Sequence, residues 1–305
     1  MPLAVGPAMS ASGGSGGAGV AIITLVAPTW LDPQHIARAT ALVEGEAGPL
    51  MDGRAAQVVT AVPLRQARTV LEAALPSIDL LLREDDVPLP QLIIADMDST
   101  MITVECIDEL ADYAGIKPQV AAITERAMRG ELDFRAALEA RVALLKAMPA
   151  ETLDRCLAER VQLMPGARTM VRTLKGRGAK ALLVSGGFTR FAEPVAKAIG
   201  FDDVIANRLE IERDHLSGKV EGAIVDASTK LAALEQEVAG GVPRAATLAI
   251  GDGANDAPML AAAGWSVAYR PHAVAADAAQ CAIRHTDHRA ILYACGIAEA
   301  DWVTD

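Results

Sequence analysis

Short apolar runs alternate with amphipathic segments along most of the chain, which is the pattern of an α/β protein. The apolar runs predict strands at 20–26, 56–62, 78–82, 92–95, 180–184, 204–205, 247–250, 267–269 and 281–283. Helical periodicity predicts helices at 33–44, 64–74, 104–114, 118–129, 133–147 and 150–160, with others beginning near 190 and 230. The run at 92–95 is continuously apolar, as expected of a strand buried on both faces of a parallel sheet. We therefore expect a doubly wound α/β fold around a parallel sheet.

The pattern also divides the chain into segments. Residues 1–17 are rich in Gly, Ser and Ala and are expected to form a flexible tail. Residues 18–86 carry the strands and helices of a small α/β domain. Residues 104–160 contain helical patterns only, which indicates a helical cap inserted into the second domain. The core of that domain is expected to combine residues 87–103 with residues 161–305.

Charge and composition narrow the function classes. The chain has 305 residues, a net charge of -11 and 51% hydrophobic residues, which favours a well-packed globular protein. An acidic chain without a basic run is a poor candidate for nucleic-acid binding. An anionic substrate would need a local positive field, from a metal ion or a few cationic side chains.

The cysteines and the termini bear on location. None of the four cysteines forms a C-x-x-C pair or a zinc-binding pattern, so a reduced cytoplasmic protein is expected. The N-terminus has no basic region ahead of an apolar one, so we expect no secretory signal. Apolar runs all stay below the roughly 18 residues of a transmembrane helix, so no membrane span is expected.

Two carboxylates follow the strand at 92–95 directly. Asp96 and Asp98 stand where the strand ends, and ligands of open α/β sheets bind beyond the carboxyl ends of strands. Two such carboxylates can hold a hard divalent cation, and one of them can act as a nucleophile. An Asp-x-Asp pair alone is also a common polar turn. The later segments favour the catalytic interpretation.

Three later segments carry matching chemistry. Ser185 is followed by two glycines, Gly186 and Gly187, which allow backbone amides to approach a phosphoryl oxygen closely. Lys230 lies at the start of a predicted helix, where a lysine is ordinarily a solvated charge. The segment from Gly251 to Asp256 reads Gly-Asp-Gly-Ala-Asn-Asp and turns tightly enough to bring a carboxylate to a metal ion.

The order Asp-x-Asp, Ser-Gly-Gly, Lys and Gly-Asp-Gly-Ala-Asn-Asp resembles the haloacid-dehalogenase-like phosphatases, and within them the phosphoserine phosphatases. The resemblance extends over residues 91–297. It implies Mg²⁺-dependent hydrolysis of O-phospho-L-serine, the last step of serine biosynthesis. Mg²⁺ would be held by Asp96, the backbone carbonyl of Asp98, and Asp252.

The resemblance also assigns catalytic roles. Asp96 would attack phosphorus and form an aspartyl-phosphate, and Asp98 would act as general acid and then as general base. Ser185 and Lys230 would stabilise charge on the phosphoryl oxygens.

A substrate pocket follows from the same resemblance. Glu105 would pair with the substrate ammonium group, and Arg141 would hold its carboxylate in a bidentate fork. The remaining positions expected to bind the substrate are Ser185, Gly186, Met128, Phe134 and Asn255. As cap residues, Glu105 and Arg141 could equally be exposed helix charges, and Met128 and Phe134 could be packing residues of a helical bundle.

Residues 18–86 resemble the ACT-like ligand-binding domains, although only three of the four strands of that unit can be found in the sequence. Regulation by an amino acid and a packing or dimerisation role, as in a homodimer, both remain open for this domain. Two alternatives to phosphoserine hydrolysis also remain. One is another phosphatase or phosphotransferase of the superfamily, and the other is an amino-acid-sensing module.

Overall fold

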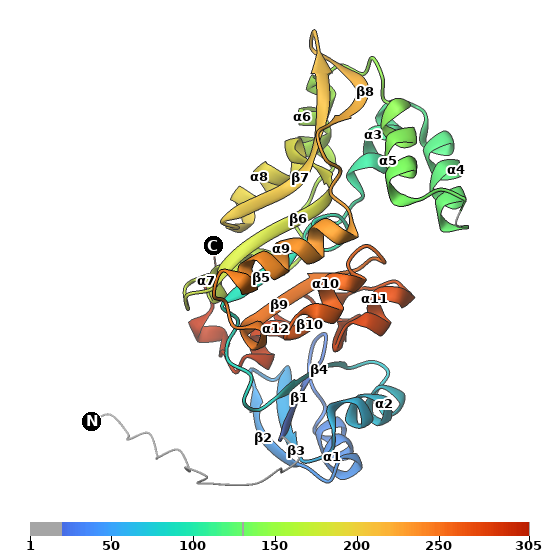
Figure 1. Cartoon of the computed structure of the whole chain (residues 1–305). Helices are drawn as coiled ribbons and strands as arrows, with labels where there is room; N and C mark the ends of the chain where they lie inside the picture. Colours follow the sequence, from blue (N-terminus) through green and yellow to red (C-terminus); the bar gives the residue numbers. More distant parts are fainter. Residues whose placement is uncertain (1–19, 130, 305) are drawn as a thin grey trace.

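The computed structural model describes residues 20–129 and 131–304, so the predicted tail at 1–17 lies outside the described residues (Figure 1). Its N-terminal part has the order βαββαβ, with antiparallel strands arranged as β4-β1-β3-β2. Its elements are β1 (Ala21–Val26), α1 (Pro33–Leu42), β2 (Glu46–Met51), β3 (Ala55–Thr60), α2 (Leu64–Ala74) and β4 (Asp79–Glu84). This is a ferredoxin-like arrangement. The ACT-like assignment stays a prediction.

The prediction of only three N-terminal strands was wrong, because β2 is present. It carries Gly48 and Pro49, and its residues Glu46 to Leu50 are exposed. It lies at the edge of the sheet, and its register with β3 shifts between Ala47 and Leu50. Proline and glycine are tolerated at such an edge, where hydrogen bonds on one side are not needed.

The second domain contains a parallel sheet in the order β11-β10-β9-β5-β6-β7, which confirms the predicted α/β class. The first of its strands is β5 (Leu92–Ala95). The other elements of this domain are α7 (Ala167–Lys175), β6 (Lys180–Phe188), α8 (Thr189–Ile199), β7 (Asp203–Glu212), β8 (His215–Glu221), α9 (Ala227–Ala239), β9 (Thr247–Gly251), α10 (Ala257–Ala262), β10 (Trp265–Tyr269), α11 (Ala273–Ala278), β11 (Cys281–Ile283) and α12 (Ala290–Ala294).

Helices cover both faces of this sheet. Ile93 and Ala95 of β5 pack into one apolar core with residues of α7, α8 and α12. Leu92 and Ile94 face a second core with residues of α9, α10 and α11. The alternation explains the unbroken apolar run of β5, since each successive side chain is buried on the opposite face.

One continuous 11-stranded sheet includes both sets of described strands, because β4 pairs antiparallel with β11. At this seam the Trp265 indole donates to the carbonyl of Leu82 at 3.1 Å, and the Leu82 amide contacts the Cys281 sulfur at 3.0 Å. The N-terminal strands therefore extend the sheet of the core.

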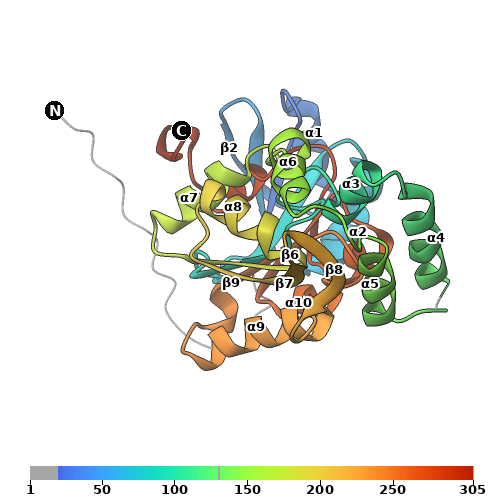
Figure 2. The same ribbon diagram turned by 90° about the horizontal axis from the view of Figure 1, so that it is seen from above.

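The helical insert consists of α3 (Cys106–Tyr113), α4 (Lys117–Met128), α5 (Phe134–Ala143) and α6 (Glu151–Arg160). Figures 1 and 2 show α3, α4 and α5 standing to one side of the main sheet, near the hairpin of β7 and β8. This hairpin is bonded to the segment between α5 and α6, where the Ala147 amide donates to Leu216 and the Ala150 amide to Asp214. Within the described residues, no helix is both long and apolar enough to cross a membrane.

Candidate active site

Asp96 lies at the carboxyl end of β5, which is the central strand of the parallel sheet. The chain proceeds from β5 to β6 on one side, whereas β9 pairs with β5 on the other side. Such a switch point opens a crevice beyond the strand ends, where ligands of doubly wound folds bind. The Asp96 amide donates to the carbonyl of Ile250 at 3.0 Å, which fixes Asp96 against the end of β9.

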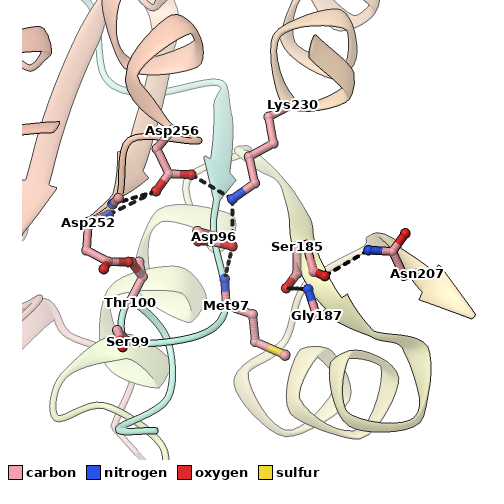
Figure 3. Close-up of polar contacts among 12 residues, drawn as sticks. Asp96, Met97, Ser99, Thr100, Ser185, Gly187, Asn207, Lys230, Asp252 and Asp256 are labelled. Atoms are coloured by element: carbon pink, nitrogen blue, oxygen red, sulfur yellow. Dashed lines mark hydrogen bonds and ion pairs between the residues drawn. The ribbon is translucent and has the colours of Figure 1, made fainter. Parts of the chain in front are cut away.

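Lys230 connects two carboxylates at the centre of the site (Figure 3). Its Nζ lies 2.8 Å from Asp96 Oδ1 and 2.6 Å from Asp256 Oδ1, and its side chain is fully buried. The lysine projects from α9, whose N-terminus is capped by the side chain of Asp226. A solvated helix charge is therefore excluded for Lys230.

Asp256 organises the loop that follows β9. Its Oδ2 accepts hydrogen bonds from the backbone amides of Asp252 and Gly253, at 3.1 and 2.9 Å. A Cβ at Gly251 would lie 2.4 Å from the Asp256 carboxyl carbon, so no other residue fits at this position. The Asp252 carboxylate is then held by Thr100, whose hydroxyl donates to Asp252 Oδ1 at 2.7 Å.

The electrostatics of the site follow from burial. Desolvation raises the pKa of Asp96 well above its usual value, although the adjacent ammonium group of Lys230 opposes the shift. Burial also raises the pKa of Asp252 to about 6, against the hydrogen bond from Thr100. Burial disfavours the charge on Lys230, but the carboxylates of Asp96 and Asp256 outweigh it and raise the pKa of Lys230.

Asp98 is partly buried beside the Ser-Gly-Gly segment. Its Oδ1 has no hydrogen-bond partner among the described residues, and a Cβ at Gly187 would lie 3.0 Å from its Oδ2. Burial raises the pKa of Asp98 to about 7, with a further contribution from Glu105, while hydrogen bonds from Cys106 act in the opposite direction. A buried carboxyl with an unused oxygen is suited to exchanging a proton with a ligand.

The segment Ser185-Gly186-Gly187 lies inside β6, which continues to Phe188; the prediction that this strand ends at Val184 was wrong. The Ser185 hydroxyl accepts a hydrogen bond from the Gly187 amide at 2.9 Å. Asn207, on the adjacent strand β7, donates to the Gly186 carbonyl and accepts from the Val225 amide, both at 2.8 Å. The extension and register shift of β6 are thus stabilised by its neighbour.

The helical insert formed by α3 to α6 is the predicted cap, and two of the residues expected there, Arg141 and Glu105, can be placed. Arg141 is partly buried on α5, and burial lowers its pKa although the nearby carboxylates of Asp108, Glu105 and Asp98 favour its charge. Glu105 is exposed and accepts a hydrogen bond from the Ser99 hydroxyl at 2.6 Å. The side chain of Met128 lies outside the described residues.

Two more of the expected substrate-binding residues, Phe134 and Asn255, come from different parts of the fold. A Cβ at Gly186 would lie 3.1 Å from Phe134 Cζ, so the ring at the start of α5 packs against the Ser-Gly-Gly segment. Asn255 is partly buried in the loop after β9, and its Oδ1 lies beside Gly253. The cap therefore contacts the core through Phe134.

Several residues of the site were not found from the sequence. They include Thr100, which holds Asp252; Asn207, which holds Gly186; and Cys106, which contacts Asp98. The ion pair between Asp256 and Lys230 was not foreseen either. A Thr in an Asp-x-Asp-Ser-Thr run was the available signal for Thr100, whereas nothing local marks Asn207.

The site offers oxygen ligands to a metal ion. Carboxylate oxygens of Asp96, Asp252 and Asp256 lie within 4.8 Å of one another. Both oxygens of Asp256 are engaged by Lys230 and backbone amides, while Asp96 and Asp252 each take their contacts on Oδ1. The Oδ2 atoms of Asp96 and Asp252 therefore remain as oxygen donors, which suit a hard divalent cation.

Comparisons with known proteins agree with this geometry. Residues 93–261 match the profile of the haloacid dehalogenase-like hydrolases. A phosphoserine phosphatase of Mycobacterium tuberculosis is 44% identical over 212 residues, 69% of this chain and 52% of that protein. The chain thus spans about half the length of this relative.

Solved structures cover more of the chain. A HAD family hydrolase from Salmonella enterica is 28% identical, with a TM-score of 0.82 over 90% of this chain and 97% of that one. A probable phosphoserine phosphatase from Vibrio cholerae is 35% identical, with a TM-score of 0.73 over 90% of this chain and 88% of that one. With its profile match, its fold and its acidic switch-point site, the chain belongs to the haloacid dehalogenase-like hydrolase family.

Proposed function

We propose that the protein hydrolyses O-phospho-L-serine to L-serine and phosphate, with Mg²⁺ as its cofactor. The observation that carries the reaction is the buried Asp96 carboxylate, held by Lys230 at a sheet switch point beside a second carboxyl, Asp98. The substrate assignment is supported by relatives named phosphoserine phosphatases, which are 44–47% identical to this chain.

Mg²⁺ would be held by the side chains of Asp96 and Asp252 and by the backbone carbonyl of Asp98. When bound, the ion offsets the repulsion between the Asp96 carboxylate and the anionic phosphate. Thr100 would keep Asp252 in position, because its hydroxyl occupies Oδ1 and leaves Oδ2 for the ion.

Asp96 is the nucleophile in this proposal. An oxygen of its carboxylate attacks phosphorus, the bond from phosphorus to the serine oxygen breaks, and an aspartyl-phosphate forms. Asp98 donates its proton to the departing serine oxygen. It then accepts a proton from the water that attacks the aspartyl-phosphate, which restores Asp96 and releases phosphate.

Cationic and hydrogen-bonding groups support the transferring phosphoryl group. Lys230 already contacts Asp96 and would extend the same ammonium group toward the phosphoryl oxygens. Ser185 and the amide of Gly186 would donate to these oxygens from β6. Because Lys230 is fully buried, its charge is screened little by water and acts at short range.

The cap would supply specificity. Arg141 would bind the substrate carboxylate, and Glu105 would bind its ammonium group. Phe134, Met128 and Asn255 would complete the pocket. This arrangement agrees with the position of Arg141 near the carboxylates of Glu105, Asp108 and Asp98, which favour its charge against the larger effect of burial.

The test is a turnover assay with O-phospho-L-serine and Mg²⁺, beside a panel of other phosphate esters and beside Asp96→Asn. We expect phosphoserine to have the highest kcat/KM of the panel and the variant to lose nearly all turnover. Borohydride trapping and mass spectrometry should place the phosphoenzyme on Asp96. A higher kcat/KM for another ester of the panel would contradict the phosphoserine assignment. An adduct on Ser99 or Ser185 would refute the mechanism.

A further inference from the structure

A cavity lies where the N-terminal sheet meets the C-terminal part of the core. It has a volume of about 210 Å³, and none of the residues assigned to the active site lines it. Its polar lining comes chiefly from Arg54 before β3, Arg270 after β10, and Asp287 and Arg289 before α12. Tyr293 and Trp302 contribute aromatic surface. We call this the seam cavity.

The three arginines keep donors available for a ligand. Arg54 uses Nε and Nη2 to bind the carbonyls of Thr29 and Pro28. Arg289 uses the same two nitrogens to bind Asp287. In each guanidinium the Nη1 group remains, and both side chains are fixed by their existing bonds.

Arg270 is the least engaged of the three. Among the described residues its guanidinium makes no hydrogen bond or ion pair, and it lies over the Tyr269 ring at 5.4 Å. Its backbone has φ of 43°, a left-handed conformation that is uncommon for a residue other than glycine. The Arg270 amide is bonded to the Ile283 carbonyl at 2.7 Å, which holds this conformation. Strained backbone of this kind concentrates at ligand sites and switches.

The charge of the seam cavity is opposite to that of the protein. Three arginines and one aspartate give a formal charge of +2 (three positive less one negative), in a chain of net charge -11. A positively charged concave site on an acidic protein raises the local concentration of anions. Because the arginines come from three separate segments, a ligand with two separated anionic groups fits better than one compact ion. Guanidinium groups bind carboxylates as bidentate forks.

We propose that the seam cavity binds a small organic dicarboxylate and that its occupancy is transmitted to Asp252. One connection runs along the chain from Arg270 to His272, whose amide donates to the Asp252 carbonyl at 2.9 Å. The other begins at His288, between Asp287 and Arg289.

His288 is fully buried, and its Nε2 donates to the Thr100 carbonyl at 2.8 Å. The Thr100 hydroxyl in turn donates to Asp252 Oδ1. A ligand that draws Arg270 and Arg289 together therefore acts on both connections to one side chain. The claim that occupancy of the cavity is transmitted to Asp252 rests on the function proposed for Asp252.

Binding is tested by titrating the full chain with succinate in a calorimeter at constant ionic strength. We expect saturable binding, and Arg270→Gln and Arg54→Gln should each raise Kd at least about tenfold through loss of charge-assisted hydrogen bonds. Arg284→Gln is the matched control, because Arg284 is exposed on the adjoining loop but does not line the cavity. Asp96→Asn should also leave succinate binding unchanged.

Absence of saturable binding, or equal binding by wild type and both cavity variants, would overturn the site. Sulfate is the competing probe, and tighter binding of sulfate than of succinate would overturn the dicarboxylate assignment. Melting curves of each variant verify that the fold is retained.

Transmission is tested by kinetics. Succinate should change kcat/KM for phosphoserine about fivefold or more in wild type, a typical allosteric coupling, and should have no effect on Arg270→Gln. Without succinate the two proteins should turn over alike. Binding without any kinetic effect would refute transmission, whereas an enzyme inactive on phosphoserine would refute the proposed function and leave the calorimetry intact.

Discussion

Lys230 has no exposed surface and lies between two carboxylates, so its effect on stability should be large. Lys230→Met would leave Asp96 and Asp256 buried and facing each other without a cation. Removing one partner of a buried ion pair costs about 3–5 kcal/mol. Urea unfolding should show a loss of this order.

The control for Lys230→Met is Lys180→Met. Lys180 pairs with Glu237 and Asp203, but its side chain is 40% exposed. Surface pairs contribute at most about 1 kcal/mol, so this variant should lose little stability. Equal losses of unfolding free energy in the two variants would show that the buried ion pairs of Lys230 contribute no more to stability than a surface pair.

His288 should make stability depend on pH in the acid range. Burial lowers its pKa to about 4, and the ring stacks on Tyr269 with centroids 4.1 Å apart. The unfolded chain binds the proton from about pH 6.5 downward, while the folded protein binds it only near pH 4. Stability should therefore fall by roughly 3 kcal/mol as pH decreases across this interval.

The variant His288→Phe keeps an aromatic ring against Tyr269 but cannot titrate. Its unfolding free energy should depend less steeply on pH between 6.5 and 4 than that of wild type, although it is lower at neutral pH. Parallel pH profiles for the two proteins would show that other groups cause the acid loss.

At the scale of residues, the sequence was informative where chemistry follows directly from a strand. Asp96 directly follows one apolar run and Asp252 follows another after a single glycine, and the structure brings them within reach of one metal ion. Thr100 and His288 could not be paired in this way, because only the completed fold brings α12 beside the loop after β5. The catalytic roles themselves stay predictions.

At the scale of elements, α5 carries the determinant of specificity in our proposal. Arg141→Ala should lower kcat/KM for phosphoserine about thirtyfold or more, because truncating one partner of a buried charge pair costs about 2–5 kcal/mol. Hydrolysis of p-nitrophenyl phosphate should change little, since it has no carboxylate. The two substrates are measured on wild type and variant.

Arg135→Ala is the control on the same helix, because Arg135 is exposed near its start. It should leave both substrates unaffected. If Arg141→Ala lowers both substrates equally, then Arg141 serves cap structure or phosphate binding. If it lowers neither, Arg141 is a solvated helix charge.

Two elements show why parts of the fold were not predictable from local pattern. β2 was missed because Gly48, Pro49 and exposed neighbours carry no strand signal, and its place at the sheet edge is fixed by β3. The end of β6 was predicted too early, because glycines usually mark a turn. In the structure Asn207 keeps Gly186 in the sheet. In both cases contacts with a neighbouring strand determine where the strand forms or ends, and the sequence of a single segment does not contain that information.

At the scale of the whole molecule, Asp79 fastens the N-terminal strands to the core. Its buried carboxylate accepts hydrogen bonds from the amides of Arg284, His285 and Thr286 and from the Thr286 hydroxyl. Asp79→Ala should destabilise the protein by at least about 3 kcal/mol, because several buried donors lose a charged acceptor. Thermal or urea unfolding measures this.

The matched control is Asp86→Ala, since Asp86 is exposed just beyond the same strand. It should change stability by less than about 0.5 kcal/mol. A small effect of Asp79→Ala would mean that the loop after β11 holds its conformation without this anchor.

The pairing of β4 with β11 has a consequence for how the protein is made on the ribosome. β4 is synthesised long before its partner strand, Cys281–Ile283. Until that strand has been made, Leu80 and Leu82, which are buried in the folded protein, lie on an open strand edge. Open apolar edges recruit other chains. A nascent chain arrested before Cys281 should therefore bind chaperones or aggregate, whereas a chain arrested after Ile283 has left the ribosome should do so much less.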